Sequence, residues 1–499
     1  MNVFVRTDAS VRIGTGHLMR CLALAQALQQ RGARVSFIMR EVPAALTETI
    51  EGLGFKLIRL PEGTAREAGG LGVPRDTDAL QTAAVLEAQG NADWLVIDHY
   101  GIDYRWEERV RTPNLKMLVI DDLAQARHSC EVLLNQNLLA DAQTRYRSLV
   151  PETCRLLTGP RFALLREEFH ACRTSLHRDF GQVRNLLVFL GGTDPDGVTL
   201  RVLNVLDGLR PRDFKVTAVL GAGSPHRATI ERAYAGRAGF QVIVQSSNMA
   251  QLMAAADLAV GAGGVSTWER CCLGLPSIAI AIAENQLEAS RAAAAAGAFL
   301  YLGSSADISD DELAASLKVV TGNASLRRSL SEVGSRLVDG QGCRRAANAV
   351  LQEPLQVRPA RTDDAERVFA WRNDERTRRF SHDSRPLTLE AHLQWFRECL
   401  RDSQRVLLIG EAGQRPVGVL RYDIERDIAT TSIYLDPALH GRGYGSSLLL
   451  SGDRWLKQTR PDIARVRAEI GLENHGSRSA FAEAGYRAHG LVFNKSLEI

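Results

Sequence analysis

Long apolar runs are missing from this sequence, and their absence excludes one class of protein at the outset. No stretch of about 18 consecutive apolar residues occurs, so a membrane-spanning helix is not expected. The N-terminal stretch MNVFVRTDAS carries Arg6 and Asp8 where a secretory signal would need apolar residues. We therefore expect a cytoplasmic protein without a membrane partner.

Paired cysteine motifs are missing as well. The 8 cysteines are scattered, Cys271 and Cys272 are adjacent, and no pair has C-x-x-C spacing. This pattern argues against a zinc site and against a disulfide framework. We expect reduced, buried thiols and no bound metal.

An excess of charge of one sign is also lacking. The chain has 61 Lys and Arg against 58 Asp and Glu, a net charge of +3, and no long block of either sign. This balance gives no electrostatic reason to expect a nucleic-acid partner. A hydrophobic content of 45% and a charged content of 24% are typical of a globular enzyme. The length suggests about three domains, while the oligomeric state stays open.

Short, continuous apolar runs alternate with helical segments along the first 350 residues. Expected strands are 3–6, 35–39, 94–98, 117–121, 185–192, 216–221, 240–244, 258–261 and 277–282, and expected helices include 17–30, 248–257 and 266–274. Continuous runs are typical of strands buried on both faces, and strand–helix alternation predicts parallel sheets. The sequence thus predicts two Rossmann-like domains, residues 1–170 and 182–350, joined near residues 165–184.

The pattern changes after two prolines in LQEPLQVRPA, residues 351–360. Strands are expected at 406–411, 416–424 and 430–435, with a hairpin around Gly413. Residues 355–499 therefore form a separate domain of the α+β class.

The stretch RIGTGHLMR, residues 12–20, places a histidine where a glycine loop enters a helix. Gly14 and Gly16 allow a ligand to approach the backbone, and the helix start near His17 suits a phosphate or sugar. Ligands of open α/β sheets bind at the carboxyl ends of strands, where this chain has Arg6, Asp8, Asp98, His99, Tyr100, Asp121 and Asp122. A neutral histidine can serve there as a general base. A lone histidine that only caps or packs the helix is the alternative.

Two further glycine turns occur in the second predicted sheet. LGGTDPDG (190–197) and VGAGGVSTWER (260–270) each open a helix, an arrangement that suits a pyrophosphate, with a carboxylate such as Glu269 for a ribose. Neither turn has the P-loop pattern or the dinucleotide-binding pattern. The alternative is that the glycines only allow tight helix–strand packing.

Together these motifs give the first 350 residues a specific resemblance. RTDASVRIGTGHLMRCLALAQAL, IDHYG, LLNQN, ALLREEF, GGTD and GAGGVSTWE occur in the order found in the UDP-2,4-diacetamido-2,4,6-trideoxy-β-L-altropyranose hydrolases of pseudaminic acid biosynthesis. The resemblance implies a GT-B arrangement of the two Rossmann-like domains and hydrolysis of a UDP-sugar with inversion at the anomeric carbon. It also implies that no metal takes part.

The same resemblance implies roles for individual residues. His17 would be the general base, and Asn285 would be a second catalytic residue. The remaining candidates would bind the substrate: Arg6, Asp8, Gly14, Gly16, Asp98, His99, Tyr100, Gly191, Gly192, Thr193, Ser266, Thr267, Glu269 and Gln286.

The C-terminal domain has motifs of its own. Gly441-Arg442-Gly443-Tyr444-Gly445 follows a predicted strand and enters a helix, so its backbone N–H groups suit a pyrophosphate. With Asn474, Ser477 and FAEAGY (481–486), and with WRN and EAHLQWF upstream, the segment resembles the GNAT N-acetyltransferases. The resemblance implies acetyl-CoA as co-substrate, bound by Leu435, His440, Gly441, Arg442, Gly443, Tyr444, Gly445, Ser446, Asn474 and Ser477.

One position departs from the GNAT pattern. Phe481 stands where many members of that family have a tyrosine that protonates the leaving thiolate. Phenylalanine has no proton to donate, so the sequence identifies no catalytic acid, and His440, Tyr444 and Tyr486 are only neighbours of the motifs.

The two resemblances together predict a bifunctional enzyme. The GNAT domain would acetylate the 4-amino group of the UDP-sugar precursor, and the hydrolase would act on the product. Two alternatives stay open: a GT-B glycosyltransferase, and a GNAT domain that only binds acetyl-CoA or acetylates another amine. The sugar stereochemistry is also open, because related pathways use similar enzymes.

Overall fold

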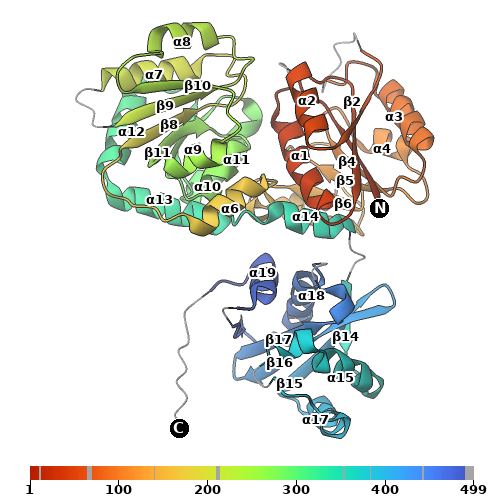
Figure 1. The fold of residues 1–499 in the computed structure, drawn as a ribbon. Coiled ribbons are helices and arrows are strands. Elements are labelled where there is room, and N and C mark those ends of the chain that lie inside the picture. The colour runs from red at the N-terminus through yellow and green to blue at the C-terminus, as the bar shows by residue number, and fades with distance from the viewer. Residues whose placement is uncertain are drawn as a thin grey trace. The chain divides into compact units, whose positions relative to one another are not determined.

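Residues 1–10, 13–63, 70–139, 141–209, 214–351, 355–381, 384–440, 443–471 and 473–488 are described in the computed structural model. The chain divides into two units, Met1–Val350 and Leu351–Ile499, which we describe separately (Figure 1). Within the described ranges, no helix is long and apolar enough to cross a bilayer. The same ranges contain no group of three or more His, Cys, Asp or Glu side chains placed to hold a metal ion.

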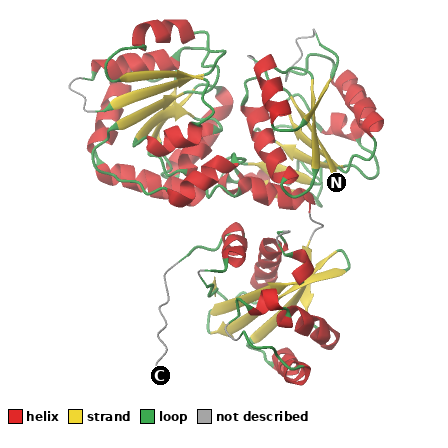
Figure 2. Cartoon of the chain, viewed as in Figure 1, coloured by secondary structure: helices red, strands yellow, loops and turns green. Residues whose placement is uncertain are grey.

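The first half of unit 1 is a seven-stranded parallel sheet in the order β3-β2-β1-β4-β5-β6-β7. Its strands are β1 (Asn2–Thr7), β2 (Arg34–Met39), β3 (Lys56–Arg59), β4 (Trp94–Asp98), β5 (Lys116–Ile120), β6 (Val132–Asn135) and β7 (Arg155–Thr158). Its helices are α1 (Gly16–Gln29), α2 (Ala44–Gly52), α3 (Arg75–Gln89), α4 (Tyr104–Val110) and α5 (Ala142–Tyr146). The predicted parallel sheet is confirmed, with helices on both of its faces (Figure 2).

The second half of unit 1 is a six-stranded parallel sheet in the order β10-β9-β8-β11-β12-β13. Its strands are β8 (Asn185–Phe189), β9 (Lys215–Leu220), β10 (Phe240–Val244), β11 (Leu258–Ala262), β12 (Ser277–Ala281) and β13 (Leu300–Ser304). Its helices are α6 (Glu167–Ser175), α7 (Val198–Gly208), α8 (Arg227–Tyr234), α9 (Met249–Ala255), α10 (Ser266–Cys272), α11 (Leu287–Ala295), α12 (Asp310–Gly322) and α13 (Ala324–Leu337).

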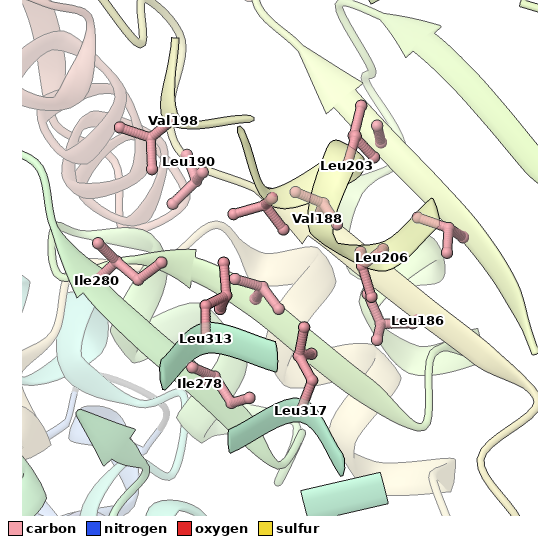
Figure 3. Close-up of a cluster of buried hydrophobic side chains, with 14 of the residues drawn as sticks. Leu186, Val188, Leu190, Val198, Leu203, Leu206, Ile278, Ile280, Leu313 and Leu317 are labelled. Atoms are coloured by element: carbon pink, nitrogen blue, oxygen red, sulfur yellow. The ribbon is translucent and has the colours of Figure 1, made fainter. Parts of the chain in front are cut away.

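The continuous apolar runs of the central strands β8, β11 and β12 are buried on both faces, as predicted. On one face, Leu186, Val188 and Ile278 pack against Leu203 of α7 and Leu317 of α12, all fully buried (Figure 3). A second cluster on the other face includes Leu187, Ala259 and Ala279 with Trp268 of α10. Removing this apolar surface from water is the main force that holds the sheet to its helices.

A last helix of unit 1, α14 (Gly342–Leu351), returns to the segment that follows the first sheet. Cys343 Sγ donates to the Leu165 carbonyl at 3.2 Å, and Arg345 donates to the Arg161 carbonyl at 2.7 Å. A Cβ built on Gly342 would lie 2.1 Å from the Ala163 carbonyl oxygen, so only glycine fits where this helix begins. The chain therefore crosses between the two halves twice (Figure 1).

Each sheet has a point where the strand order reverses. In the first sheet it lies between β1 and β4, and in the second between β8 and β11. The loops after such neighbouring strands diverge to opposite faces and leave room for a ligand. These four loops and the strand and helix ends that border them contain predicted site residues: Gly14, Gly16, Asp98, Tyr100, Gly191, Gly192 and Ser266.

Unit 2 is built on a five-stranded sheet in the order β14-β15-β16-β17-β18. Its strands are β14 (Leu355–Pro359), β15 (Arg405–Ala412), β16 (Arg415–Glu425), β17 (Ile428–Leu435) and β18 (Arg465–Arg467). Its helices are α15 (Ala365–Asn373), α16 (Glu375–Arg378), α17 (Leu389–Arg401), α18 (Tyr444–Thr459) and α19 (His475–Glu483). The hairpin predicted around Gly413 is confirmed as the antiparallel pair β15–β16.

The last two strands of unit 2 pair only in part. β18 runs parallel to β17 and pairs with residues 428–430, whereas β16 pairs with β17 along its whole length. In the described residues, the second half of β17 therefore has a neighbouring strand on one side only.

Candidate functional site

His17 lies in the first turn of α1, where the loop after β1 enters the helix. Gly14 has φ +84°, a conformation that favours glycine, and α1 begins at Gly16. The His17 side chain is about nine-tenths buried, and its Nδ1 lies 2.5 Å from Oδ1 of Asp98, the last residue of β4. With Nδ1 directed at a carboxylate, Nε2 is the nitrogen that can accept a proton.

Arg20 binds the same carboxylate from one turn further along α1. Its Nε and Nη2 donate to the two oxygens of Asp98 at 2.6 and 2.7 Å, and its Nη1 donates to Asp122 at 2.6 Å. Burial raises the pKa of Asp98, but the charge of Arg20, together with the hydrogen bonds from Arg20 and His17, outweighs it and holds that pKa well below its usual range. Asp98 is therefore a fully ionised carboxylate under the imidazole.

The sequence analysis did not assign a role to Arg20. A signal was available, because residues three apart in a helix lie on the same face, and Arg20 follows His17 at that spacing. Asp122 was noted as a strand-end carboxylate, but its pairing with Arg20 depends on the neighbouring positions of β4 and β5.

Tyr100 and Asn285 complete the surroundings of His17. The Tyr100 ring lies edge-on to the imidazole with centroids 4.6 Å apart, and its hydroxyl donates to Asp122 at 3.3 Å. Asn285, between β12 and α11, donates from Nδ2 to the Tyr100 hydroxyl at 3.2 Å. Burial raises the pKa of Tyr100, and Asp122 raises it further, so the phenol keeps its proton. Tyr100 is 38% exposed, so a ligand can reach it.

The loops of the two sheets meet at this point. A Cβ built on Gly192, after β8, would lie 3.4 Å from Thr15 Oγ1, and one built on Gly16 would lie 3.7 Å from Val265, after β11. Arg145 of α5 also donates to Glu288 of α11 at 2.6 and 2.9 Å. The loop that carries the predicted base therefore lies next to both glycine turns of the second sheet.

Three predicted substrate-binding residues lie beneath this site rather than in it. The side chains of Arg6 and Asp8 have no exposed surface; Arg6 donates to Asp8 at 2.8 Å and to Asp78 at 2.7 and 3.2 Å. His99 accepts from Gly101 N at 3.0 Å, and its Nε2 lies 3.4 Å from Asp8. The polar atoms of these side chains face one another in the interior. Asp98 is also buried, with 1% of its surface exposed, and it contacts His17.

The predicted UDP-binding residues surround the turns after β8 and β11. Gly191 has φ +97°, and Gly192 and Thr193 follow it at partly exposed positions. Ser266 Oγ accepts from Arg270, and the buried Thr267 hydroxyl donates to the Ala262 carbonyl at 3.1 Å. Thr267 therefore fixes the turn.

Glu269 and Gln286 also contact these turns. Glu269 lies 3.6 Å from Arg166, and burial raises its pKa against the charges of Arg166 and Arg270. Gln286 accepts from Ile282 N at 3.1 Å, and its amide lies beside Gly264, where a Cβ would be 3.5 Å away. Both side chains therefore already have protein partners around the turn after β11.

In unit 2, the predicted acetyl-CoA site surrounds the start of α18. Gly443 has φ +82° and precedes this 16-residue helix, and Ser446 Oγ donates to its carbonyl at 3.0 Å. A Cβ on Gly445 would lie 3.1 Å from Ala480 of α19, so the glycine allows the two helices to approach closely. Leu435 ends β17, and His440 and Tyr444 lie at exposed and partly exposed positions. Gly441 and Arg442 lie outside the described residues.

The remaining GNAT motif residues lie on α19 or directly beside its ends. Asn474 Oδ1 accepts from Ser477 N at 3.0 Å and so caps this helix. Phe481 is buried, with its ring edge-on to Tyr486 at 4.9 Å. The Tyr486 hydroxyl donates to Asp453 at 2.9 Å, and Tyr422 donates to the same carboxylate at 2.7 Å. The phenol proton of Tyr486 is thus already directed at a carboxylate.

Relatives match both the first unit and the whole chain. A spore coat polysaccharide biosynthesis protein SpsG of Bacillus subtilis is 28% identical over 358 residues, 71% of this chain and 98% of that protein. A UDP-2,4-diacetamido-2,4,6-trideoxy-β-L-altropyranose hydrolase of Campylobacter jejuni is 25% identical over 51% of this chain and 81% of its own length. An uncharacterized protein of Methanocaldococcus jannaschii is 21% identical over 98% of this chain and 97% of its own.

The fold comparison and the family model divide the chain in the same way as the structure. The crystal structure of Acinetobacter baumannii MurG matches 70% of this chain and 99% of its own, with a TM-score of 0.50 and 14% identity. Residues 355–487 match the acetyltransferase (GNAT) domain model. The predicted fold class is confirmed: the chain joins an α/β unit of GT-B fold, similar in sequence to a UDP-sugar hydrolase, to a C-terminal GNAT domain.

Proposed function

We propose that unit 1 hydrolyses UDP-2,4-diacetamido-2,4,6-trideoxy-β-L-altropyranose. The observation that carries this proposal is the His17–Asp98 pair, at 2.5 Å, at the strand-order reversal of the first sheet. An imidazole held by a carboxylate is the arrangement that a general base needs. The similarity to the Campylobacter jejuni hydrolase supports the choice of substrate.

In the proposed reaction, His17 takes a proton from water as the water oxygen bonds to the anomeric carbon. The bond between that carbon and the UDP oxygen breaks on the opposite face, so the configuration inverts and UDP leaves as an anion. Asp98 holds the imidazole through Nδ1 and stabilises the imidazolium that forms. Tyr100 and Asn285, which are hydrogen-bonded to each other, would orient the sugar.

UDP would lie against the loops of the second sheet. Gly191, Gly192 and Thr193 after β8 and Ser266 and Thr267 after β11 flank its strand-order reversal. In this proposal, backbone N–H groups of these loops stabilise the charge that develops on the leaving phosphate.

Unit 2 would acetylate the 4-amino group of the precursor of the same sugar. The second half of β17 has a neighbouring strand on one side only, and backbone groups on its other side would bind the pantetheine of acetyl-CoA. The start of α18 at Gly443 suits the pyrophosphate of acetyl-CoA. The amine nitrogen would bond to the acetyl carbon as the C–S bond breaks and CoA leaves. We assign no acid, because Phe481 has no proton and Tyr486 donates to Asp453.

A second candidate function follows from the fold. The GT-B fold also occurs in glycosyltransferases, in which an acceptor hydroxyl would take the place of water. UDP release without any acceptor excludes this candidate, because a transferase needs an acceptor to complete its reaction.

The test is UDP release from UDP-2-acetamido-4-amino-2,4,6-trideoxy-β-L-altrose, with and without acetyl-CoA. We expect release only with acetyl-CoA, together with one CoA formed per UDP. Equal release in both conditions would mean that unit 1 ignores the 4-position and that unit 2 serves another substrate. No release in either condition, and none from the diacetylated sugar, would contradict the proposed substrate.

A further inference from the structure

Arg20 is the side chain beside His17 that the proposed mechanism does not yet use. It is 2% exposed, and its guanidinium contacts Asp98, Asp122 and the His17 ring. Such a buried cation next to a general base affects whether that base is free to accept a proton.

We propose that Arg20 is a positioning residue that keeps the His17 imidazole unprotonated and oriented for proton abstraction from water. This inference rests on the proposed hydrolysis, in which His17 is the base. It concerns a residue to which neither the motif resemblance nor the comparisons give a role.

The contacts of Asp98 fix the orientation of the His17 imidazole. Asp98 Oδ1 contacts His17 Nδ1 at 2.5 Å and accepts from Arg20 Nη2 at 2.7 Å. Asp98 Oδ2 accepts from Arg20 Nε at 2.6 Å and from Cys21 Sγ at 3.4 Å. Both carboxylate oxygens are engaged, so Asp98 cannot rotate, and the imidazole that it holds keeps its orientation.

Arg20 also acts on the imidazole through its charge. A carboxylate alone beside a histidine favours the imidazolium, which cannot act as a base. Arg20 Nη2 lies 3.3 Å from His17 Nδ1, and a guanidinium keeps its charge at every pH of interest. The positive charge of Arg20 therefore disfavours a second proton on the imidazole ring. The one proton of the neutral ring stays on Nδ1, in its hydrogen bond to Asp98.

No other charge around the imidazole replaces that of Arg20 among the described residues. Tyr100 and Cys21 have raised pKa values through burial and stay neutral, and Asn285 has no charge. Asp122 contacts Arg20 and Tyr100 rather than the ring. By holding Nη1 at 2.6 Å, Asp122 also prevents the guanidinium from turning away from Asp98.

The experiment compares Arg20→Gln and Arg20→Lys through the pH dependence of kcat/KM for UDP release. Arg20→Gln removes the charge, so the imidazolium persists to higher pH. We expect the acidic limb of its pH profile to move up by about one pH unit or more. The loss of kcat/KM relative to the parent should then be about tenfold greater at pH 6 than at pH 9. Arg20→Lys keeps the charge with fewer donors, so we expect a lower rate but an acidic limb within about 0.3 units of the parent.

Arg40→Lys is the matched control. Arg40 is also buried in the first sheet, where it donates to Asp78 at 2.7 Å, and it has no contact with His17. We expect lower thermal stability and an unmoved acidic limb. The same loss at all pH values in Arg20→Gln would overturn the inference, because a purely structural role predicts it.

An NMR titration of the His17 ring in the full chain, with labelled histidine and His17→Ala for assignment, separates the two proposals. Protonation that extends to higher pH in Arg20→Gln supports the inference even if the parent releases no UDP, in which case only the proposed function fails. An identical titration in the parent and in Arg20→Gln overturns the inference.

Discussion

At the scale of single residues, the site depends on buried charges that compensate one another. Asp98 and Arg20 are each about 2% exposed or less, and each would be costly to bury alone. Removing one partner of such a pair leaves the other charge buried and unpaired. Residues of this network therefore affect both stability and chemistry, whereas His17 and Tyr100 at its surface affect chemistry first.

We expect His17→Ala to lower UDP release by about 10²–10⁴-fold, the contribution usual for a general base. The measurement is the initial rate of UDP release from the diacetylated UDP-sugar, with UDP affinity as the control for an intact second sheet. A loss of UDP affinity as large as the loss of rate would instead indicate that the loop had collapsed.

Asp8 makes the first sheet sensitive to acid. Burial raises the pKa of Asp8, but the charge of Arg6 and the neighbouring His99 outweigh it and lower the pKa from 3.8 to about 2. A lowered pKa stabilises the fold at pH values above the pKa of the same group in the unfolded chain. This stabilisation, about 2 kcal/mol here, is lost as the pH falls from about 4 towards 2. Denaturant unfolding of the parent and Asp8→Asn between pH 6 and pH 2 should show a shallower acid dependence in the variant. An equal dependence would show that other carboxylates account for it.

At the scale of elements, glycines set how closely the loops approach one another. A Cβ built on Gly221, after β9, would lie 1.7 Å from the carbonyl oxygen of Gly192, after β8. Because the contact is with backbone rather than with a flexible side chain, it cannot be relieved by a rotamer change. The loop that is proposed to hold UDP therefore depends on a glycine one strand away.

We expect Gly221→Ala to displace the Gly191–Gly192 turn at a cost of about 1–3 kcal/mol, or roughly ten- to a hundredfold in UDP affinity. Gly223→Ala is the control, because a Cβ there has no atom within 4 Å among the described residues. Isothermal titration with UDP compares the two variants. Equal affinities would mean that UDP does not lie against this turn.

At the scale of the whole molecule, the chain forms two units with separate cores. The clusters around Leu186 and Trp268 belong to unit 1, and those around Leu420 and Phe396 belong to unit 2. The residues proposed for hydrolysis belong to unit 1, and those proposed for acetyl transfer belong to unit 2. The two activities should therefore respond independently to substitution.

Gly443→Glu tests this independence. Its φ of +82° disfavours a side chain, and a carboxylate at the start of α18 repels a pyrophosphate. We expect acetyl-CoA affinity to fall at least about tenfold, while UDP release from the diacetylated sugar stays as in the parent. His17→Ala should show the converse, with acetyl transfer intact. Loss of both activities in either folded variant would contradict the division into two modules.

Much of the fold could be predicted because buried parallel strands are continuous apolar runs. β1, β4, β8 and β12 all match predicted segments. Six strands were not predicted: β3, β6, β7, β13, β14 and β18. Among them, β3, β7 and β18 have three or four residues each and carry charged side chains, as in KLIR and RLLT. Short strands at or near a sheet edge gain their pairing from neighbours that local sequence does not specify.

The sequence by itself determined which chemical groups the site contains. His17, Tyr100 and the glycine turns are recognisable because glycine loops at strand ends and a histidine at a helix start have local causes. Only the tertiary structure decided which of these groups lie at the surface and which are buried against one another. Arg6, Asp8 and His99 follow strands just as Tyr100 does, but the packing of α3 brings Asp78 under them and closes that network inside. The pairing of Asp98 with Arg20, and of Tyr100 with Asn285, joins positions 78 and 185 residues apart. Such contacts come from sheet order and the meeting of two sheets, which no local pattern encodes.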